Sequence, residues 1–489
     1  MNDLQKHFSN FRNNIIGIDK KYNSPYGLQQ IVYGDWIASG RLYQPIEEVM
    51  SKKIGPYVAN THTESNETAT LMTNSYHHAQ KIIKEHVNAG KDDVIITGGN
   101  GMTSMINKFQ RILGLKTCGK INRHSCLQDG DKPVVFITHM EHHSNQTSWL
   151  ETVADVVVIQ PGKDLLVDLD KLRDELKKYS DRKLKIGAFT ACSNVTGIST
   201  PINQMARIMH EYEGVCIVDY AASAPYVDIN MHPEDPMEKL DAIVFSPHKF
   251  LGGPGSCGVL VFDSSFYKSK VPDNPGGGTV DWTNPWGEYK YIDNIEMRED
   301  GGTPGFLQTI RAALCIKLKD QMKTSLIKQQ EDYLLKLAFD ELDNIPNLKI
   351  LANNVRERLG VISFYFKNIH YNLVVKLLSD RFGIQVRGGC ACAGTYGHYL
   401  LNVSYDNSKK ITRMINSGDL SEKPGWIRLS LHPTMTKQEI NYICNAIKEI
   451  EKNHEKWSND YDYNPKCNEF KHISDPSDLA EKVKKWFEI

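Results

Sequence analysis

Short apolar runs alternate with amphipathic segments over about residues 90–262. Apolar runs that lack a polar alternation predict strands buried on both faces. The runs are Val94–Thr97, Val134–Thr138, Asp155–Ile159, Ile186–Thr190, Val215–Asp219, Ala242–Phe245 and Val259–Phe262. Between them, Leu169–Tyr179 and Ile202–Glu211 have apolar residues at helical spacing. This alternation favours an α/β fold in which helices cover both faces of a mostly parallel sheet.

The remainder of the chain predicts a smaller second domain. A helical pattern from Phe306 to Leu342 predicts two elongated helices or one bent helix. Residues 347–452 then alternate between strand and helix patterns, as in a compact α+β domain. We predict an N-terminal segment at 1–30, a large domain at 31–320, a small α+β domain at 321–452, and a C-terminal tail at 453–489 with a polar linker and a short amphipathic helix.

Composition excludes several classes of protein. Of the 489 residues, 40% are hydrophobic and 24% are charged, which is ordinary for a soluble globular protein. The formal net charge of -1 gives no broad attraction to nucleic acid or to an anionic membrane. We find no secretory signal and no apolar stretch of the ~20 residues that a membrane span requires. We expect a cytoplasmic protein that binds neither nucleic acid nor membrane.

The ten cysteines indicate reduced thiols, because disulfide frameworks belong mainly to small secreted domains. Cys118, His124 and Cys126 lie close together in a predicted loop. No second cysteine pair has metal-site spacing, so we predict no metal site. Cys390 and Cys392 differ from the other cysteines because they lie in a polar, glycine-rich stretch.

Polar motifs follow several predicted strands, and ligands of open parallel sheets bind beyond the carboxyl ends of the strands. The segment SPHKFLGGPG, residues 246–255, places Lys249 just after an apolar strand. An amine there could attack the aldehyde of a cofactor. Ser246 and His248 flank Lys249 and could donate hydrogen bonds to a phosphate. Taken alone, the segment is more typical of a surface lysine before a glycine-rich turn.

Three further motifs follow other strands. Asp219 ends a strand thirty residues before Lys249, and a carboxylate there could hold the proton on a pyridine nitrogen. His142 could stack on a cofactor ring and move protons, and Asn194 could donate to a phenolic oxygen. Residues 97–107, TGGNGMTSMIN, predict a glycine-rich turn before a helix, a typical phosphate site. The expected phosphate contacts in that turn are Gly101, Met102 and Thr103.

As a set, SxHKxxGGPG, VDxA at 218–221 and EHHxN at 141–145 resemble the class V aminotransferase family, in its cysteine desulfurase-like branch. The resemblance covers about residues 30–450. It implies the fold type I of pyridoxal 5'-phosphate (PLP) enzymes and a homodimer. The segment EDGGTPG, residues 299–305, is similar to the family stretch that supplies a threonine to the partner's phosphate, which implies that Thr303 reaches the other subunit.

The resemblance also implies a role for each matching residue. Lys249 would form the Schiff base with PLP. The other expected cofactor contacts are Asp219 at the pyridine nitrogen, His142 on the ring, Asn194 at the phenolic oxygen, and Ser246, His248, Gly101, Met102 and Thr103 at the phosphate.

Two segments bear on the reaction. VRGGCACAGTYGH, residues 386–398, matches the family's Arg-x-Gly-x-x-Cys pattern with Arg387 and Cys392, and implies that Cys392 accepts sulfur. GWIRLSLHP, residues 425–433, places Arg428 where the family has the arginine that binds the substrate carboxylate, which a guanidinium fork matches. We expect Arg428, Arg387 and Asn194 to bind a small amino acid, and Lys249, His142 and Cys392 to be catalytic. The expected reaction converts cysteine to alanine with a persulfide on Cys392, which a sulfur-acceptor protein would then take.

The chain departs from the desulfurase pattern at two places. Ala222 replaces the family's glutamine, and residues 399–425 are longer than in ordinary desulfurases. One alternative is therefore a class V aminotransferase or lyase that acts on another amino acid, with Cys392 not catalytic. A second is a non-enzymatic binding or assembly module, which the retention of Lys249, Asp219 and Arg428 disfavours.

Overall fold

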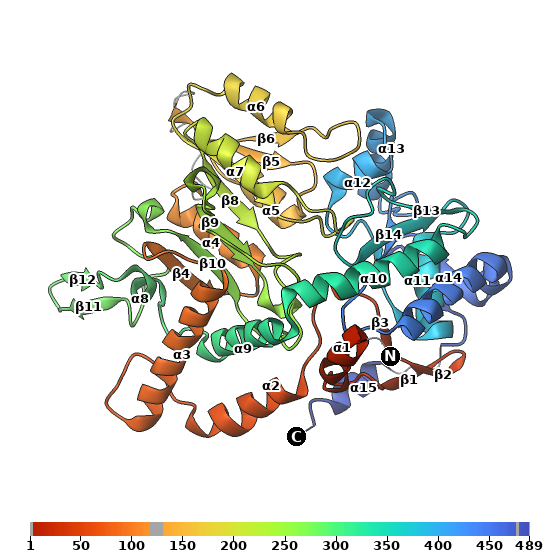
Figure 1. The fold of residues 1–489 in the computed structure, drawn as a ribbon, viewed down its shortest axis with the longest axis horizontal. Helices are drawn as coiled ribbons and strands as arrows, with labels where there is room; N and C mark the ends of the chain where they lie inside the picture. Colours follow the sequence, from red (N-terminus) through yellow and green to blue (C-terminus); the bar gives the residue numbers. More distant parts are fainter. Residues whose placement is uncertain (1–2, 117–130, 476–478, 489) are drawn as a thin grey trace. The chain divides into compact units, whose positions relative to one another are not determined.

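The computed structural model describes residues 3–116, 131–475 and 479–488 (Figure 1). The chain forms two compact units. The larger unit is Ile37–Lys328, and the smaller unit joins Met1–Trp36 to Gln329–Ile489. Cys118, His124 and Cys126 lie outside the described residues. No helix of the described part of the chain is long and apolar enough to cross a membrane.

A seven-stranded sheet in the order β4-β10-β9-β8-β7-β5-β6 forms the centre of the larger unit. Its strands are β4 (Asp93–Gly98), β5 (Val134–Thr138), β6 (Asp155–Ile159), β7 (Lys185–Thr190), β8 (Val215–Asp219), β9 (Ala242–Phe245) and β10 (Gly258–Asp263). Each predicted strand is confirmed to within one residue at either end. Neighbours are parallel except at β10, which runs antiparallel to both β4 and β9. The mostly parallel α/β sheet is therefore confirmed.

Helices cover both faces of this sheet, which explains the continuous apolar strands. On one face, α4 (Met102–Ile112) and α5 (His143–Leu150) contribute Phe109 and Trp149 to a core that includes Ile186 and Ala188 of β7. On the other face, α7 (Ile202–Glu211) packs so closely that a Cβ on Gly187 would lie 2.9 Å from the Met209 side chain. The helix α6 (Leu169–Lys178) packs beside α7.

The predicted helical pattern over Phe306–Leu342 is two helices, α9 (Phe306–Met322) and α10 (Thr324–Leu342). They separate at Lys323, whose φ of 63° is left-handed and ends the first helix. Within the larger unit, α9 packs along α3 (Glu67–His86). Further elements of this unit include α2 (Gln44–Glu48), the π-helix Val49–Ile54, α8 (Ile295–Glu299) and the hairpin of β11 (Val280–Thr283) with β12 (Tyr289–Tyr291).

A four-stranded sheet in the order β13-β14-β17-β16 forms the centre of the smaller unit. Its strands are β13 (Leu348–Ile350), β14 (Val361–Phe366), β16 (Arg387–Gly389) and β17 (Trp426–Ser430). Most of α10 lies in this unit, whose further helices include α1 (Asp3–Asn13), α11 (Tyr371–Phe382), α12 (Gly394–Leu400), α13 (Tyr405–Asn416), α14 (Lys437–Trp457) and α15 (Leu479–Lys485). Two further pairings involve the N-terminal segment: the hairpin β1 (Lys21–Ser24) with β2 (Gly27–Gln30), and β3 (Val32–Tyr33) parallel to β15 (Ile384–Gln385).

The C-terminal tail contains a hairpin, β18 (Tyr461–Asn464) with β19 (Glu469–His472), where the sequence predicts a polar linker. The Tyr461 hydroxyl donates to the buried carboxylate of Asp380 at 3.1 Å. Asn468 in the turn donates to the hydroxyl of Tyr371 at 2.7 Å. Side-chain hydrogen bonds to α11, together with ring contacts of Tyr463 and Phe470 with His370, hold this polar hairpin in place.

A substitution at Gly253 tests the close packing after β9. A Cβ at Gly253 would overlap the carbonyl oxygen of Pro247 and lie 3.0 Å from that of Phe250. Because backbone atoms cannot move aside cheaply, we expect Gly253→Ala to destabilise the protein by about 1–3 kcal/mol. The thermal midpoint should fall by roughly 2–10 °C. Gly277→Ala is the matched control, since nothing lies within 4 Å of its added Cβ. Equal midpoints for the two variants would contradict this packing.

Candidate active site

The residues singled out by sequence fall into two sets, one in each compact unit. Lys249 and the expected cofactor contacts belong to the larger unit, whereas Arg387, Cys392 and Arg428 belong to the smaller unit.

Lys249 and Asp219 lie at the carboxyl ends of neighbouring parallel strands. Asp219 is the last residue of β8 and pairs with Val244 of β9, and Lys249 ends the short 3-10 turn (Pro247–Lys249) that follows β9. Burial raises the pKa of Asp219 to about 6, against the hydrogen bond from the Ala221 N–H and the positive charge of Lys249. A buried carboxylate of this kind is stabilised by any further cationic N–H brought next to it.

The glycine-rich turn before α4 is joined to the Lys249 turn. The N–H of Met102, the first residue of α4, donates to the Ser246 hydroxyl at 2.8 Å. Gly101 has a φ of 135°, and a Cβ there would lie 2.9 Å from the Ser246 oxygen. Burial, together with the positive charge of Lys249, lowers the pKa of His248 to about 4, so this imidazole is neutral. Hydroxyls, a neutral imidazole and a helix N-terminus around a glycine-rich turn suit a phosphate.

Ser144 connects this turn to the predicted stacking histidine. The hydroxyls of Thr103 and Ser144 are 2.7 Å apart, and the Ser144 N–H donates to Nδ1 of His142 at 3.1 Å. His142 thereby caps the N-terminus of α5, which fixes the ring at the end of β5. Because Nδ1 accepts, the neutral ring carries its proton on Nε2.

Asn194 lies in the loop after β7, next to the end of β8. The loop is tied to β8 by the N–H of Ala191, which donates to the carbonyl of Asp219 at 2.9 Å. Asn194 itself is buried at 7% exposure. The larger unit therefore brings Asn194, Asp219, Lys249, His142 and the Gly101 turn to one edge of the sheet.

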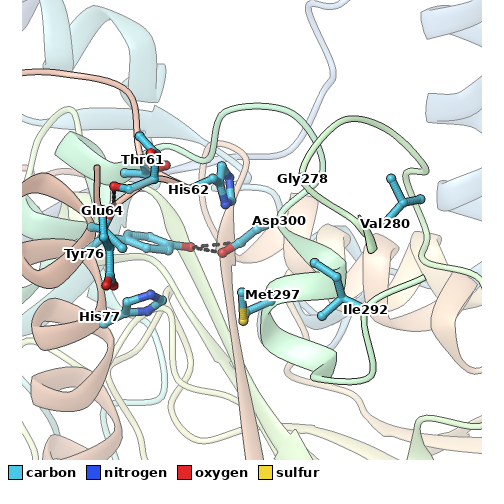
Figure 2. A pocket seen from close by; sticks show the side chains of 12 residues that line it. Thr61, His62, Glu64, Tyr76, His77, Gly278, Val280, Ile292, Met297 and Asp300 are labelled. Carbon is cyan, nitrogen blue, oxygen red and sulfur yellow. Dashed lines mark hydrogen bonds between the residues drawn. The ribbon is translucent and has the colours of Figure 1, made fainter. Parts of the chain in front are cut away.

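Thr303 lies in a different part of the larger unit. It is exposed, and its hydroxyl donates to the side-chain oxygen of Asn60 at 3.2 Å. The two segments that meet here also border a cavity of about 380 Å³ lined by Thr61, His62, Tyr76 and Asp300 (Figure 2). The Tyr76 hydroxyl is 2.9 Å from each oxygen of Asp300, and burial raises the pKa of that carboxyl to about 7.

Arg428 and Arg387 face each other in the smaller unit. They are paired residues of the antiparallel strands β17 and β16. One oxygen of Asp35 accepts from Nη2 of Arg428 at 2.9 Å, and the other accepts from Nε of Arg387 at 3.0 Å. Burial lowers the pKa of Arg428, and the Asp35 carboxylate opposes that shift.

Cys392 lies five residues beyond Arg387, in the loop between β16 and α12. It is exposed, and both Ala391 and Cys392 have left-handed backbones, with φ of 51° and 56°. A non-glycine residue in this conformation is strained, and such strain is concentrated at functional sites. A negative charge on the Cys392 sulfur acts on the Arg428 guanidinium, which places the thiol within electrostatic reach of the arginine pair.

Among residues 3–116, 131–475 and 479–488, no group of three or more His, Cys, Asp or Glu side chains is placed to hold a metal ion.

Comparison with known proteins assigns the chain to a family. The sequence profile described as aminotransferase class-V matches residues 32–443. The chain belongs to this family. It is thus a PLP-dependent enzyme of the aminotransferase class-V family, as the sequence predicted.

Curated relatives of this class-V enzyme are named probable cysteine desulfurases. One from Halalkalibacterium halodurans is 28% identical over 371 residues, which are 74% of this chain and 84% of the relative. One from Staphylococcus aureus is 25% identical over 433 residues, 88% of this chain and 94% of the relative. A solved cysteine desulfurase from Thermococcus onnurineus has a TM-score of 0.72 at 22% identity, and covers 91% of this chain and 98% of that one. This structural likeness confirms PLP fold type I.

Two residues of the class-V enzyme were not assigned a role by the sequence analysis. Glu141 is buried at 1% exposure next to His142 and accepts from the N–H groups of Thr138 and Thr190. Asp35 pairs with both arginines of the smaller unit. Glu141 was visible in the EHHxN motif, but Asp35 follows a run too short to predict a strand.

Asp300→Asn tests the buried carboxyl of the cavity. The folded pKa of about 7 lies above the unfolded value of about 4, so the stability that neutral Asp300 contributes is present below pH 4 and is lost as the pH rises to 7. Asparagine stays neutral and still accepts from Tyr76. At pH 8 the variant should therefore be more stable than wild type, by on the order of 3 kcal/mol, and the difference should vanish near pH 4.

Urea unfolding at pH 4 and pH 8 measures this difference. Asp155→Asn is a control of opposite sign: although burial raises the pKa of Asp155, hydrogen bonds from Lys132 and Arg182 lower it overall. Its substitution should therefore destabilise the protein at pH 8. The same pH dependence in wild type and Asp300→Asn would show that this carboxyl is not buried as described.

Proposed function

We propose that the protein is a cysteine desulfurase-like enzyme that converts cysteine to alanine and retains the sulfur as a persulfide on Cys392. The observation that carries this reaction is the exposed Cys392 thiol, held in a strained loop within electrostatic reach of Arg428. The relatives named as probable cysteine desulfurases support the same reaction.

The cofactor site that we propose is the carboxyl edge of the large sheet. Lys249 would attach PLP, Asp219 would face the pyridine nitrogen, His142 would lie on the ring, and Asn194 would bind the phenolic oxygen. Asp219 fits this role because it is a buried carboxylate next to a cationic amine. The phosphate would be bound by Gly101, Met102, Thr103, Ser246 and His248.

When bound, PLP supplies a ring that withdraws electrons from the α-carbon of an attached amino acid. The residues of this chain would do the rest. Arg428, assisted by Arg387, binds the α-carboxylate, and the amine of Lys249 takes the α-proton. The Cys392 thiolate attacks the sulfur of cysteine, forming an S–S bond as the Cβ–S bond breaks. One protein thiol and one cysteine thus become one persulfide and one alanine.

Two partners belong to this proposal. A homodimer would bring Thr303 to the phosphate of the other subunit, since Thr303 is exposed on the larger unit. A protein thiol would accept the sulfur, because the persulfide must be removed before another cycle begins. An exposed Cys392 is accessible to such an acceptor.

Substitution of single cysteines tests the reaction. We expect Cys392→Ala to lose sulfide and alanine production by at least about 100-fold, because the attacking thiolate is removed. Mass spectrometry after incubation with cysteine should find one added sulfur on Cys392 in wild type and none in the variant. Cys467→Ala is the matched control, since Cys467 is another exposed thiol of the same unit. Cys390→Ala separates Cys392 from its half-buried neighbour.

The outcomes distinguish the alternatives. Full activity of Cys392→Ala toward an amino acid, with conversion of the cofactor to pyridoxamine phosphate, would identify an aminotransferase instead. A purified protein that is colourless and unreactive toward added PLP would contradict the cofactor assignment itself.

A further inference from the structure

The arrangement of Arg387 and Arg428 poses an electrostatic problem. They are directly paired across β16 and β17, where like charges destabilise a sheet. The Arg428 side chain is only 4% exposed, so water screens its charge poorly. The Arg387 side chain is 51% exposed and could turn away into solvent. A negatively charged group is therefore needed to keep the two guanidiniums side by side.

Asp35 is placed to do this, because each of its oxygens engages a different arginine. The carboxylate accepts from Nη2 of Arg428 at 2.9 Å and from Nε of Arg387 at 3.0 Å. Its side chain is 14% exposed, so these charge-assisted hydrogen bonds are only partly screened. Two positive charges and one negative charge leave the cluster with one net positive charge.

Backbone hydrogen bonds to β15 and β17 fix the position of Asp35. The Gly34 N–H donates to the carbonyl of Gln385, and the Gly34 carbonyl accepts from the N–H of Ser430, each at 2.8 Å. A Cβ on Gly34 would lie 2.9 Å from the Leu429 side chain and 3.1 Å from that of Val386, so glycine allows this approach without a shift of either side chain. On the other side, the Trp36 ring stacks on His432 with centroids 4.0 Å apart. The carboxylate is therefore held by anchors on both sides.

We propose that Asp35 is the positioning residue of a two-arginine clamp: it holds Arg387 beside Arg428 and leaves the pair one positive charge for the α-carboxylate of the substrate. This inference rests on the proposed function, in which Arg428 binds that carboxylate. Without Asp35, Arg387 turns into solvent and the buried Arg428 loses this charge-assisted hydrogen bond. The stretch Met1–Trp36, which contains Asp35, is thus part of the substrate-binding apparatus.

The test uses the purified holoenzyme and the variants Asp35→Asn and Asp35→Glu. Asparagine keeps the shape and removes the charge, and glutamate restores the charge. Two quantities are measured: kcat and KM with L-cysteine, and the dissociation constant of L-alanine from the absorbance of the bound cofactor. For Asp35→Asn we expect KM and the alanine constant to rise about tenfold, the size of one charge-assisted hydrogen bond. The kcat should change less than about threefold, because the lost interaction stabilises the bound substrate and the transition state equally. The Asp35→Glu variant should recover part of the affinity.

A ligand that lacks a carboxylate tests whether the loss of affinity arises at the two arginines. Ethylamine should bind wild type and Asp35→Asn equally, because it offers nothing to the arginines. Asp460→Asn is the matched control for stability. Asp460 accepts from Tyr26 at 2.8 Å and from Arg381 at 2.9 Å, so it also ties the N-terminal segment to an arginine of the same unit. This variant should keep the alanine constant of wild type.

An alanine constant that is unchanged or lower in Asp35→Asn would overturn the clamp. An equal rise of the alanine dissociation constant in Asp460→Asn would show that Asp35 has only a structural role. If wild type binds alanine but makes none from cysteine, the desulfurase proposal fails while a tenfold loss in Asp35→Asn still establishes the clamp. A holoenzyme that binds neither amino acid overturns both proposals.

Discussion

The carboxylate of Glu141 joins the ends of three elements at the edge of the large sheet. It accepts from the N–H and hydroxyl of Thr138 at the end of β5, from the N–H of Thr190 at the end of β7, and from the amide of Asn145 in α5. Backbone groups at strand ends have no ladder partner, so a buried acceptor there decides how the chain continues. Glu141 thus helps to hold the backbone next to His142 and the start of the loop that carries Asn194.

That arrangement concentrates negative charge where water is excluded. Burial raises the pKa of Glu141 to about 7, with the nearby Asp219 adding to the shift, and raises that of Asp219 to about 6. Lys249 is the cation that opposes this cost at Asp219. A ligand that places a protonated nitrogen against Asp219 would lower the cost further, and the Gly101 turn offers N–H and hydroxyl groups to an anion. The edge of the sheet is thus matched to a ligand with a cationic end and an anionic end.

Sequence predicts the large sheet well because its strands are buried on both faces and therefore read as uninterrupted apolar runs. The sequence also marks Lys249, Asp219 and His142 as candidate site residues, because each lies at the end of such a run or shortly after it. The sequence does not predict elements whose pairing partners lie far away along the chain. The strand β3 has two residues and exists only because Ile384 and Gln385 pair with it, so nothing local marks Asp35 as a partner of Arg428. The hairpin that begins at Tyr461 is not predicted from the sequence for the same reason, because its hydrogen-bond partners lie in α11.

The strand β16 sets two parts of the proposed chemistry at once. It begins at Arg387, which faces Arg428, and ends at Gly389, three residues before Cys392. Beyond the thiol, Ala393 is fully buried and its N–H donates to the carbonyl of Cys390 at 3.1 Å, so the strained turn is closed by a hydrogen bond and anchored by packing. A slip of one residue in the pairing of β16 with β17 would move Arg387 to the other face of the sheet and carry the thiol with it. Asp35, by bonding to one arginine on each strand, favours the register in which both are correctly placed.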